Sequence, residues 1–274
     1  MVYCYPYVYS YCGEVSGMAG IWIAAVCAAA LTVLFAALSL LAKLTDRSAS
    51  LDADNPYLDE RTRPKEGFYI RVVKRGLDKL FSFFAMLLLF PLYVLVSVVI
   101  FADDPGPVLF RQKRVGRNKH YFELHKFRSM KRSAPHDVPT HMLQDPDQYL
   151  LRTGRLIRRS SLDELPQLWD IFRGKMSLVG PRPALWNQDD LVTEREKYGA
   201  NDVLPGLTGW AQVNGRDELE IPDKAKLDGD YVRALQGGGF GAFAMDTRCF
   251  FRTILSVLRR DGVLEGEQNR KEEK

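Results

Sequence analysis

Residues 80–102 read LFSFFAMLLLFPLYVLVSVVIFA, and this charge-free stretch between Lys79 and Asp103 decides the architecture of the chain. A helix of about 20 apolar residues crosses the hydrocarbon core of a membrane, so the length of this stretch permits a span. Pro91 divides it into two halves of 11 residues and removes a helical hydrogen bond at the centre. The pattern therefore predicts a kinked membrane segment.

Basic residues flank this segment on both sides, so the positive-inside rule favours neither orientation of a span. They are Lys74, Arg75 and Lys79 before it, and Arg111, Lys113, Arg114, Arg117 and Lys119 after it. A hairpin that enters and leaves on one side satisfies both flanks, and a proline-kinked transmembrane helix is the alternative. We predict a re-entrant helix over residues 71–102, with its kink at Pro91.

A second charge-free window covers residues 15–42 and predicts one transmembrane helix over residues 18–42. A secretory signal peptide is the alternative, but no basic residue precedes the window and its apolar run is too long. Basic residues follow the window, which places residues 1–17 outside and the rest in the cytoplasm. Cys4 and Cys12 would lie outside, where they could form a disulfide.

The remainder of the 274-residue chain is hydrophilic, and 26% of all residues are charged, which excludes a wholly disordered protein. Four cysteines cannot form a disulfide scaffold, and four histidines leave little for a histidine-built metal site. We expect a cytoplasmic linker over residues 43–70, a folded domain over 103–263 and a charged tail over 264–274. The two apolar windows exclude an ordinary soluble protein.

The folded domain is predicted to be α+β, mainly helical with a short β-hairpin. Residues 108–112 and 121–127 alternate in polarity around a turn at 116–118. The apolar residues of 165–172 share one helix face, and residues 243–258 form an amphipathic helix that suits either the core or a membrane interface. Residues 103–160 hold 13 Lys or Arg and 6 Asp or Glu. This excess favours anionic partners such as lipid head groups and pyrophosphate, while thin aromatic interleaving argues against nucleic acid.

The run RRSSLDELP at residues 158–166 supports two interpretations. In the first, Ser161 and Glu164 form a capping box, or Asp163 caps a helix that has Pro166 in its first turn. In the second, Asp163 is exposed and ionised, and attacks a phosphorus atom. Glu164 would then hold Mg²⁺. The phosphate-binding arginines available nearby are Arg158, Arg159 and Arg182.

Two loops rich in glycine and proline follow. Gly180–Pro183 fixes the backbone around Arg182, and residues 204–216, LPGLTGWAQVNGR, contain three glycines. Such a loop allows the close approach of a ligand, but it matches neither common nucleotide-binding glycine motif.

Taken together, these motifs resemble the bacterial sugar transferases of the monotopic phosphoglycosyl transferase superfamily. The resemblance covers residues 70–263. It rests on KRGLDKLF at 74–81, PGPVLFRQKRVGRN at 105–118, HKFRSM at 125–130, RRSSLDELPQLW at 158–169, MSLVGPRP at 176–183, LPGLTGWAQVNGR at 204–216 and LDGDYV at 227–232.

This resemblance implies transfer of a phospho-sugar from a UDP-sugar to polyprenyl phosphate, with release of UMP, at the cytoplasmic face of the inner membrane. It implies that Asp163 is the nucleophile, that Glu164 and Asp163 bind Mg²⁺, and that Pro91 kinks a re-entrant helix over 77–101. It makes residues 103–263 the catalytic domain. Substrate-binding roles follow for Lys126, Arg158, Arg159, Arg182, Gln212, Asn214, Arg216 and Asp228.

The chain departs from the family pattern at Phe90, where many members have Ser, and at Leu204, where a basic residue is common. Residues 237–239 resemble an insertion, and the helix at 18–42 is additional to the minimal catalytic unit. A homodimer and downstream glycosyltransferases are further partners that the resemblance allows. The rival interpretation is a membrane-anchored scaffold in which Asp163 and Glu164 only cap a helix.

Overall fold

The computed structural model describes residues 7–60, 66–135, 145–215 and 219–259. The chain divides into two compact units, Met1–Asp46 and Arg47–Lys274. The first unit consists of helix α1, Tyr7–Leu44. From Ile23 onward the chain is long and apolar enough to cross a membrane. The predicted apolar helix over residues 18–42 is therefore confirmed as part of a longer one.

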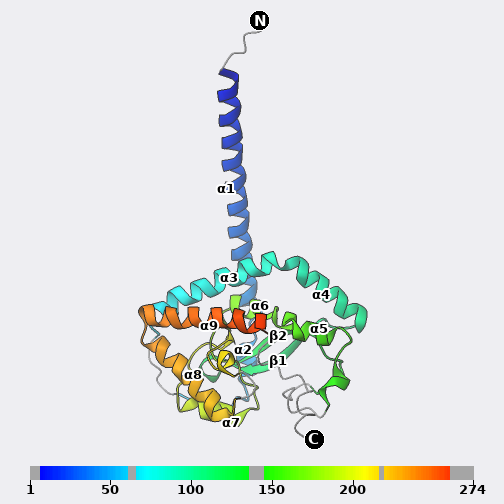
Figure 1. Cartoon of the computed structure of the whole chain (residues 1–274), viewed down its shortest axis with the longest axis vertical. Coiled ribbons are helices and arrows are strands. Elements are labelled where there is room, and N and C mark those ends of the chain that lie inside the picture. The colour runs from blue at the N-terminus through cyan, green and yellow to red at the C-terminus, as the bar shows by residue number, and fades with distance from the viewer. Residues whose placement is uncertain (1–6, 61–65, 136–144, 216–218, 260–274) are drawn as a thin grey trace. The chain divides into compact units, whose positions relative to one another are not determined.

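The second unit begins with a short helix, α2 (Ser48–Leu51), and continues after the linker into a bent helical pair. A π-helical turn, η1 (Tyr69–Lys74), leads into α3 (Arg75–Leu88), and α4 (Phe90–Asp103) follows. The two arms are bent by 62°. Figure 1 shows them as an arch along one side of this unit. The break falls at Leu89, and Pro91 lies in the first turn of α4, where a proline costs no helical hydrogen bond.

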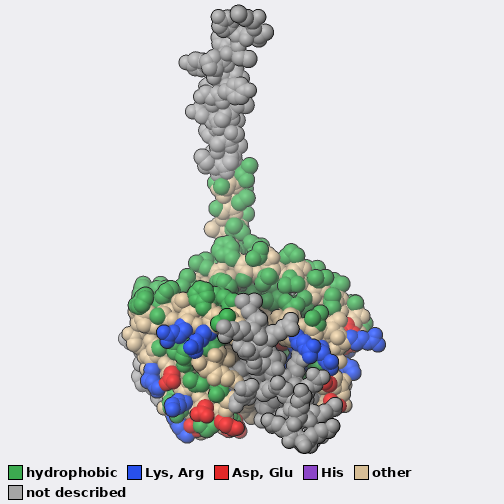
Figure 2. Space-filling view, in the orientation of Figure 1, with side chains coloured by type: hydrophobic (Ala, Val, Ile, Leu, Met, Phe, Trp, Pro, Cys, Tyr) green, Lys and Arg blue, Asp and Glu red, His purple; other side chains and the backbone are tan. Residues whose placement is uncertain are grey.

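Each arm of the arch buries one face. Ala85 and Met86 of α3 pack against a cluster that contains Phe122 and Ile171. Val96 and Ile100 of α4 pack against Phe127, Leu151 and Ile157. The other face remains exposed at Phe84, Leu88, Phe90, Leu95, Val98 and Phe101. Figure 2 shows hydrophobic side chains gathered along the arch.

The strands form two small sheets. Strands β1 (Leu109–Val115) and β2 (Tyr121–Phe127) pair antiparallel, from Leu109 opposite Phe127 to Val115 opposite Tyr121. This pair confirms the predicted hairpin. Strands β3 (Ser177–Val179) and β4 (Gly206–Thr208) pair in parallel. The domain is mostly helical with short strands, as expected.

The remaining helices surround these sheets. Their bounds are η2 Arg117–Lys119, η4 Pro146–Tyr149, α5 Gly154–Arg159, η5 Leu162–Glu164, α6 Gln167–Phe172, α7 Asp189–Glu196, η6 Gln212–Asn214, α8 Ile221–Gln236 and α9 Gly239–Arg259. Helix α9 confirms the predicted amphipathic helix. The glycines at 237–239 separate α8 from α9, and Gly238 and Gly239 have positive φ.

Candidate active site

Asp163 and Glu164 lie in η5, a single 3₁₀ turn between α5 and α6. Ser161 enters this turn with a left-handed backbone, φ 55°, and its side chain accepts no capping hydrogen bond. Helix α6 begins only at Gln167 and is preceded by Pro166, so Asp163 is not its N-cap. The interpretation of this pair as a helix cap is therefore wrong, because neither η5 nor α6 has a side-chain capping hydrogen bond at its N-terminus.

Asp163 is buried, with 7% of its surface exposed. The expectation of an exposed carboxylate at a helix end is wrong, because η5 packs against β2 and α5. Burial raises the pKa of Asp163, while the positive charge of Lys126 opposes that shift. Lys126 Nζ lies 3.7 Å from Asp163 Oδ2, which makes an ion pair rather than a hydrogen bond. The carboxylate thus keeps lone pairs available.

Glu164 is held by two cations that come from distant parts of the chain. Its Oε1 accepts hydrogen bonds from Lys126 Nζ on β2, at 3.0 Å, and from Arg182 Nη2, at 2.5 Å. Burial by itself would raise the pKa of Glu164, but the charges of Arg182 and Lys126 outweigh it and hold this pKa far below its usual range. The ionised form of Glu164 is therefore favoured, and it holds Lys126 and Arg182 beside Asp163.

A buried ion pair between Arg195 and Asp228 holds the main chain of Arg182. Arg195 of α7 donates from Nη1 to the carbonyl oxygen of Arg182 at 2.9 Å. Its Nε and Nη2 donate to Asp228 Oδ2 on α8, at 2.9 and 2.6 Å. Asp228, which was predicted to bind substrate, thus contacts Arg195, and Arg195 in turn contacts Arg182. Sequence analysis missed Arg195, since nothing distinguishes it from the other charged residues of α7.

The other predicted residues are spread around this centre. Arg158 lies in the last turn of α5 and is close enough to Asp163 to lower its pKa, whereas its neighbour Arg159 is exposed. In η6, Gln212 donates to the carbonyl oxygen of Leu207, and Asn214 accepts a hydrogen bond from Arg252. Arg216 lies outside the described residues. The structure thus brings Lys126, Arg158 and Arg182 to the acidic pair, while Gln212 and Asn214 bind other groups.

The glycines of the 204–216 loop serve chain packing. A Cβ on Gly209 would lie 2.2 Å from the carbonyl oxygen of Gly180, and one on Gly206 would lie 2.1 Å from the Gly180 nitrogen. The main chains also exchange hydrogen bonds here, Gly180 N–H to Thr208 O and Gly206 N–H to Pro181 O, both 2.8 Å. The close approach that these two glycines permit is thus to the loop that carries Arg182.

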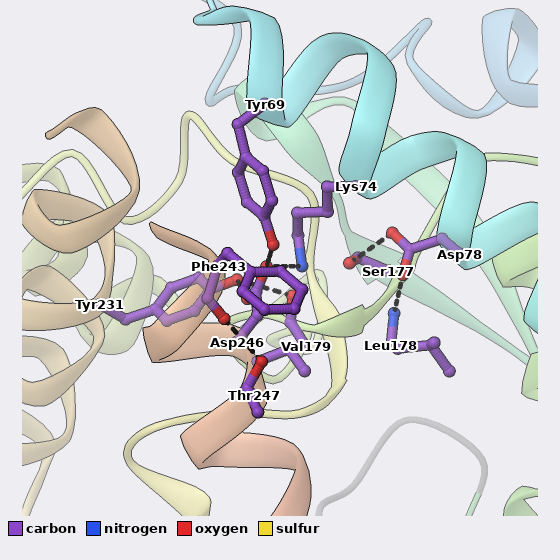
Figure 3. Close-up of polar contacts among 10 residues, drawn as sticks. All are labelled: Tyr69, Lys74, Asp78, Ser177, Leu178, Val179, Tyr231, Phe243, Asp246 and Thr247. Atoms are coloured by element: carbon purple, nitrogen blue, oxygen red, sulfur yellow. Dashed lines mark hydrogen bonds and ion pairs between the residues drawn. The ribbon is translucent and has the colours of Figure 1, made fainter. Parts of the chain in front are cut away.

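A second polar cluster, absent from the sequence-based predictions, lies near the base of α3 (Figure 3). Its centre is Asp246 of α9, which accepts hydrogen bonds from Tyr69, Lys74 and Tyr231. Nearby, Asp78 of α3 accepts hydrogen bonds from Ser177 and Leu178 of β3. Lys74, Asp78 and Tyr231 lie in two of the motifs quoted above, but no spacing along the chain indicates that these side chains gather here.

A metal would have to rely on the acidic pair. Within the described part of the chain, no group of three or more Asp, Glu, His or Cys side chains gathers as a metal site. Mg²⁺ usually takes only one or two protein carboxylates and completes its shell with water and substrate phosphate oxygens. The donor set of Asp163 and Glu164 therefore fits Mg²⁺ if substrate provides further ligands.

Comparison with known proteins identifies the family. The profile of the bacterial sugar transferase family matches residues 69–260, and the chain belongs to this family. The match contains the arch, the acidic pair and both loops that meet at Gly180.

Three relatives show the extent of the similarity. The chain is 44% identical over 191 residues to the undecaprenyl-phosphate glucose phosphotransferase of Komagataeibacter xylinus, covering 66% of this chain and 35% of that protein. It is 35% identical over 192 residues to the uncharacterized sugar transferase EpsL of Bacillus subtilis, covering 70% of this chain and 90% of EpsL. It is 31% identical over 229 residues to the exopolysaccharide production protein ExoY of Rhizobium meliloti, covering 77% and 96%. The chain thus spans about a third of the first relative and most of the other two.

Proposed function

We propose that this protein is a phosphoglycosyl transferase that moves a sugar 1-phosphate from a UDP-sugar to polyprenyl phosphate and releases UMP. The supporting observation is the buried Asp163, which keeps free lone pairs beside a glutamate clamped by Lys126 and Arg182. The name of the Komagataeibacter relative describes a reaction of this kind. Synthesis of an exopolysaccharide is the matching pathway class, as the name of ExoY states for that protein.

The proposed chemistry has two displacements at one phosphorus atom. A carboxylate oxygen of Asp163 attacks the sugar-bearing phosphorus, and the bond from that phosphorus to the UMP oxygen breaks. A phosphate oxygen of polyprenyl phosphate then attacks the same phosphorus, and the bond to Asp163 breaks. The carboxylate is regenerated, and the product is a polyprenyl diphosphate sugar.

The surrounding residues have separate roles in this scheme. Lys126 lies close enough to Asp163 to favour its ionised form, which the attack requires. Arg182 offers a planar guanidinium for the phosphates of the nucleotide. Glu164, with Asp163, would hold Mg²⁺, which neutralises charge on the pyrophosphate when it is bound. Arg195 and Asp228 keep the main chain of Arg182 in place.

The arch would place the active site at the membrane surface. We propose that α3 and α4 form a re-entrant hairpin, with Pro91 preventing one continuous helix through Leu89. The exposed apolar face and the basic flanks support insertion from the cytoplasmic side, with α1 crossing the inner membrane and the N-terminus outside. The acceptor lipid would then reach Asp163 from the same side as the hairpin.

The test is nucleotide release by purified full-length protein in nanodiscs. The protein is incubated with Mg²⁺, undecaprenyl phosphate and a panel of UDP-sugars. We expect UMP release that requires both Mg²⁺ and the lipid phosphate, and that disappears in Asp163→Asn. The matched control Asp223→Asn changes an exposed carboxylate of α8 and should leave the rate unchanged.

Two results would contradict the proposal. Release of UDP instead of UMP would indicate direct glycosyl transfer. No release from wild type with any donor, and no shift of its melting temperature by uridine nucleotides or Mg²⁺, would favour a membrane-anchored scaffold without this activity.

A further inference from the structure

The strand β3 leads directly into the Gly180–Pro183 loop that carries Arg182. It has only three residues, and its ladder partner β4 is equally short. So few ladder hydrogen bonds specify the register of a strand weakly. The position of Arg182 therefore depends on groups outside the sheet that hold β3.

Every residue of β3 is held by such a group (Figure 3). Ser177 Oγ and the Leu178 N–H donate to the two oxygens of Asp78 on α3, at 2.7 and 3.0 Å. The carbonyl oxygen of Val179 lies 2.9 Å from the hydroxyl of Tyr231 on α8. Tyr231 thus holds the end of β3 that is adjacent to the loop.

The Tyr231 hydroxyl is itself fixed. It lies 2.7 Å from Asp246 Oδ1 as well, so its single proton is shared between Val179 and Asp246. Burial first, and then the charge of Asp246, raise the pKa of Tyr231 well above its ordinary value, so it remains a donor. Asp246 is anchored in turn by Lys74 and Tyr69, which belong to the base of the arch. Tyr231 therefore connects the arch to β3.

A displacement of β3 would shift Arg182 relative to the acidic pair. Arg182 follows Val179 by three residues and must bring Nη2 within 2.5 Å of Glu164. We propose that Tyr231 is a positioning residue for the transfer reaction, because its hydroxyl holds β3 where Arg182 meets Glu164. This inference rests on the proposed function and gives a role to Tyr231, which lies in the LDGDYV motif but was assigned none from the sequence.

The experiment uses a matched pair of variants, Tyr231→Phe and Tyr69→Phe. Each removes one buried hydroxyl that donates to Asp246, but only Tyr231→Phe also removes the contact with β3. UMP release is measured in nanodiscs while each substrate is varied. We expect Tyr231→Phe to lower kcat/KM for the UDP-sugar about tenfold, because small misplacements of catalytic groups are costly. The KM for the lipid phosphate should not change, and Tyr69→Phe should stay within about twofold of wild type.

A double-mutant cycle separates positioning from general loosening. In an Arg182→Lys background, Tyr231→Phe should cost less than about twofold, because its effect passes through the arginine that is already changed. The same loss in both backgrounds, or equal losses in Tyr231→Phe and Tyr69→Phe, would overturn the inference. If Tyr231→Phe does not fold, Ser177→Ala loosens β3 from the Asp78 side and should show the same coupling to Arg182.

The outcomes also distinguish this inference from the proposed function. A wild-type protein that releases no UMP contradicts the proposed function. An active wild type whose rate is insensitive to Tyr231→Phe contradicts only the role of Tyr231.

Discussion

Asp163 and Asp246 are almost equally buried, with 7% and 8% of their surfaces exposed, yet their surroundings differ. Asp246 accepts three hydrogen bonds, from Tyr69, Lys74 and Tyr231. Asp163 has the Lys126 ammonium at 3.7 Å and, among the described residues, accepts no hydrogen bond. Burial alone therefore does not distinguish a reactive carboxylate from a structural one. The difference lies in whether the lone pairs of the buried oxygens are already used.

The largest predicted effect concerns the reactive member of this comparison. Asp163→Asn should reduce UMP release by about ten-thousandfold or more, as expected when a nucleophile is removed. Its melting temperature in detergent should remain near that of wild type, since no hydrogen bond among the described residues depends on the charge. A variant that retains substantial turnover would show that Asp163 is not the nucleophile.

Asp246, the structural member of the comparison, should matter for stability instead. Asp246→Asn removes the carboxylate charge that pairs with the buried ammonium of Lys74, and breaking a buried ion pair in this way costs about 3–5 kcal/mol. Thermal unfolding should show a melting temperature lower by roughly 2–4 °C for each kcal/mol. An unchanged melting temperature would mean that the cluster in Figure 3 contributes nothing to stability.

A smaller effect tests the packing of the two loops beside Arg182. Gly209→Ala places a Cβ 2.2 Å from the carbonyl oxygen of Gly180, and such overpacking costs about 1–3 kcal/mol. The control Gly76→Ala lies within α3, where a Cβ meets nothing within 4 Å, so it should gain up to about 1 kcal/mol of helix stability. A lower melting temperature for Gly209→Ala and a higher one for Gly76→Ala would confirm the close contact between the two loops. Equal shifts in the two variants would contradict it.

The smallest predicted effect concerns chemical labelling of Cys249, whose thiol lies under the influence of Asp246. Burial, and then the charge of Asp246, raise the pKa of the Cys249 thiol to about 12. At pH 9 only about one molecule in a thousand would carry the reactive thiolate. Peptide mapping after iodoacetamide treatment should find Cys249 unlabelled in the native protein and labelled after denaturation. Asp246→Asn should raise native labelling, because a weakened cluster opens more often, and rapid labelling of native wild type would contradict this prediction.

Much of the fold could be predicted because its signals are local. The charge-free windows predicted α1 and the arch, and alternating polarity predicted the β1–β2 hairpin. The acidic pair, Lys126 and Arg182 were identified through motifs. Two local predictions were wrong for a physical reason. The capping pattern around Ser161 and the exposed helix-end position of Asp163 both assumed a helix start, but the chain forms a separate 3₁₀ turn that packs against β2.

The sequence by itself determined which segments are apolar, where helices and the hairpin form, and to which family the chain belongs, because composition and periodicity act over short distances along the chain. Only the tertiary structure decided which charges meet. Lys74 and Asp246 are 172 residues apart, and Lys126 and Glu164 are 38 apart. Pairing and burial of such side chains depend on how distant segments pack, and no short pattern encodes that. The same packing leaves Asp163 with its lone pairs available while those of Asp246 are bound.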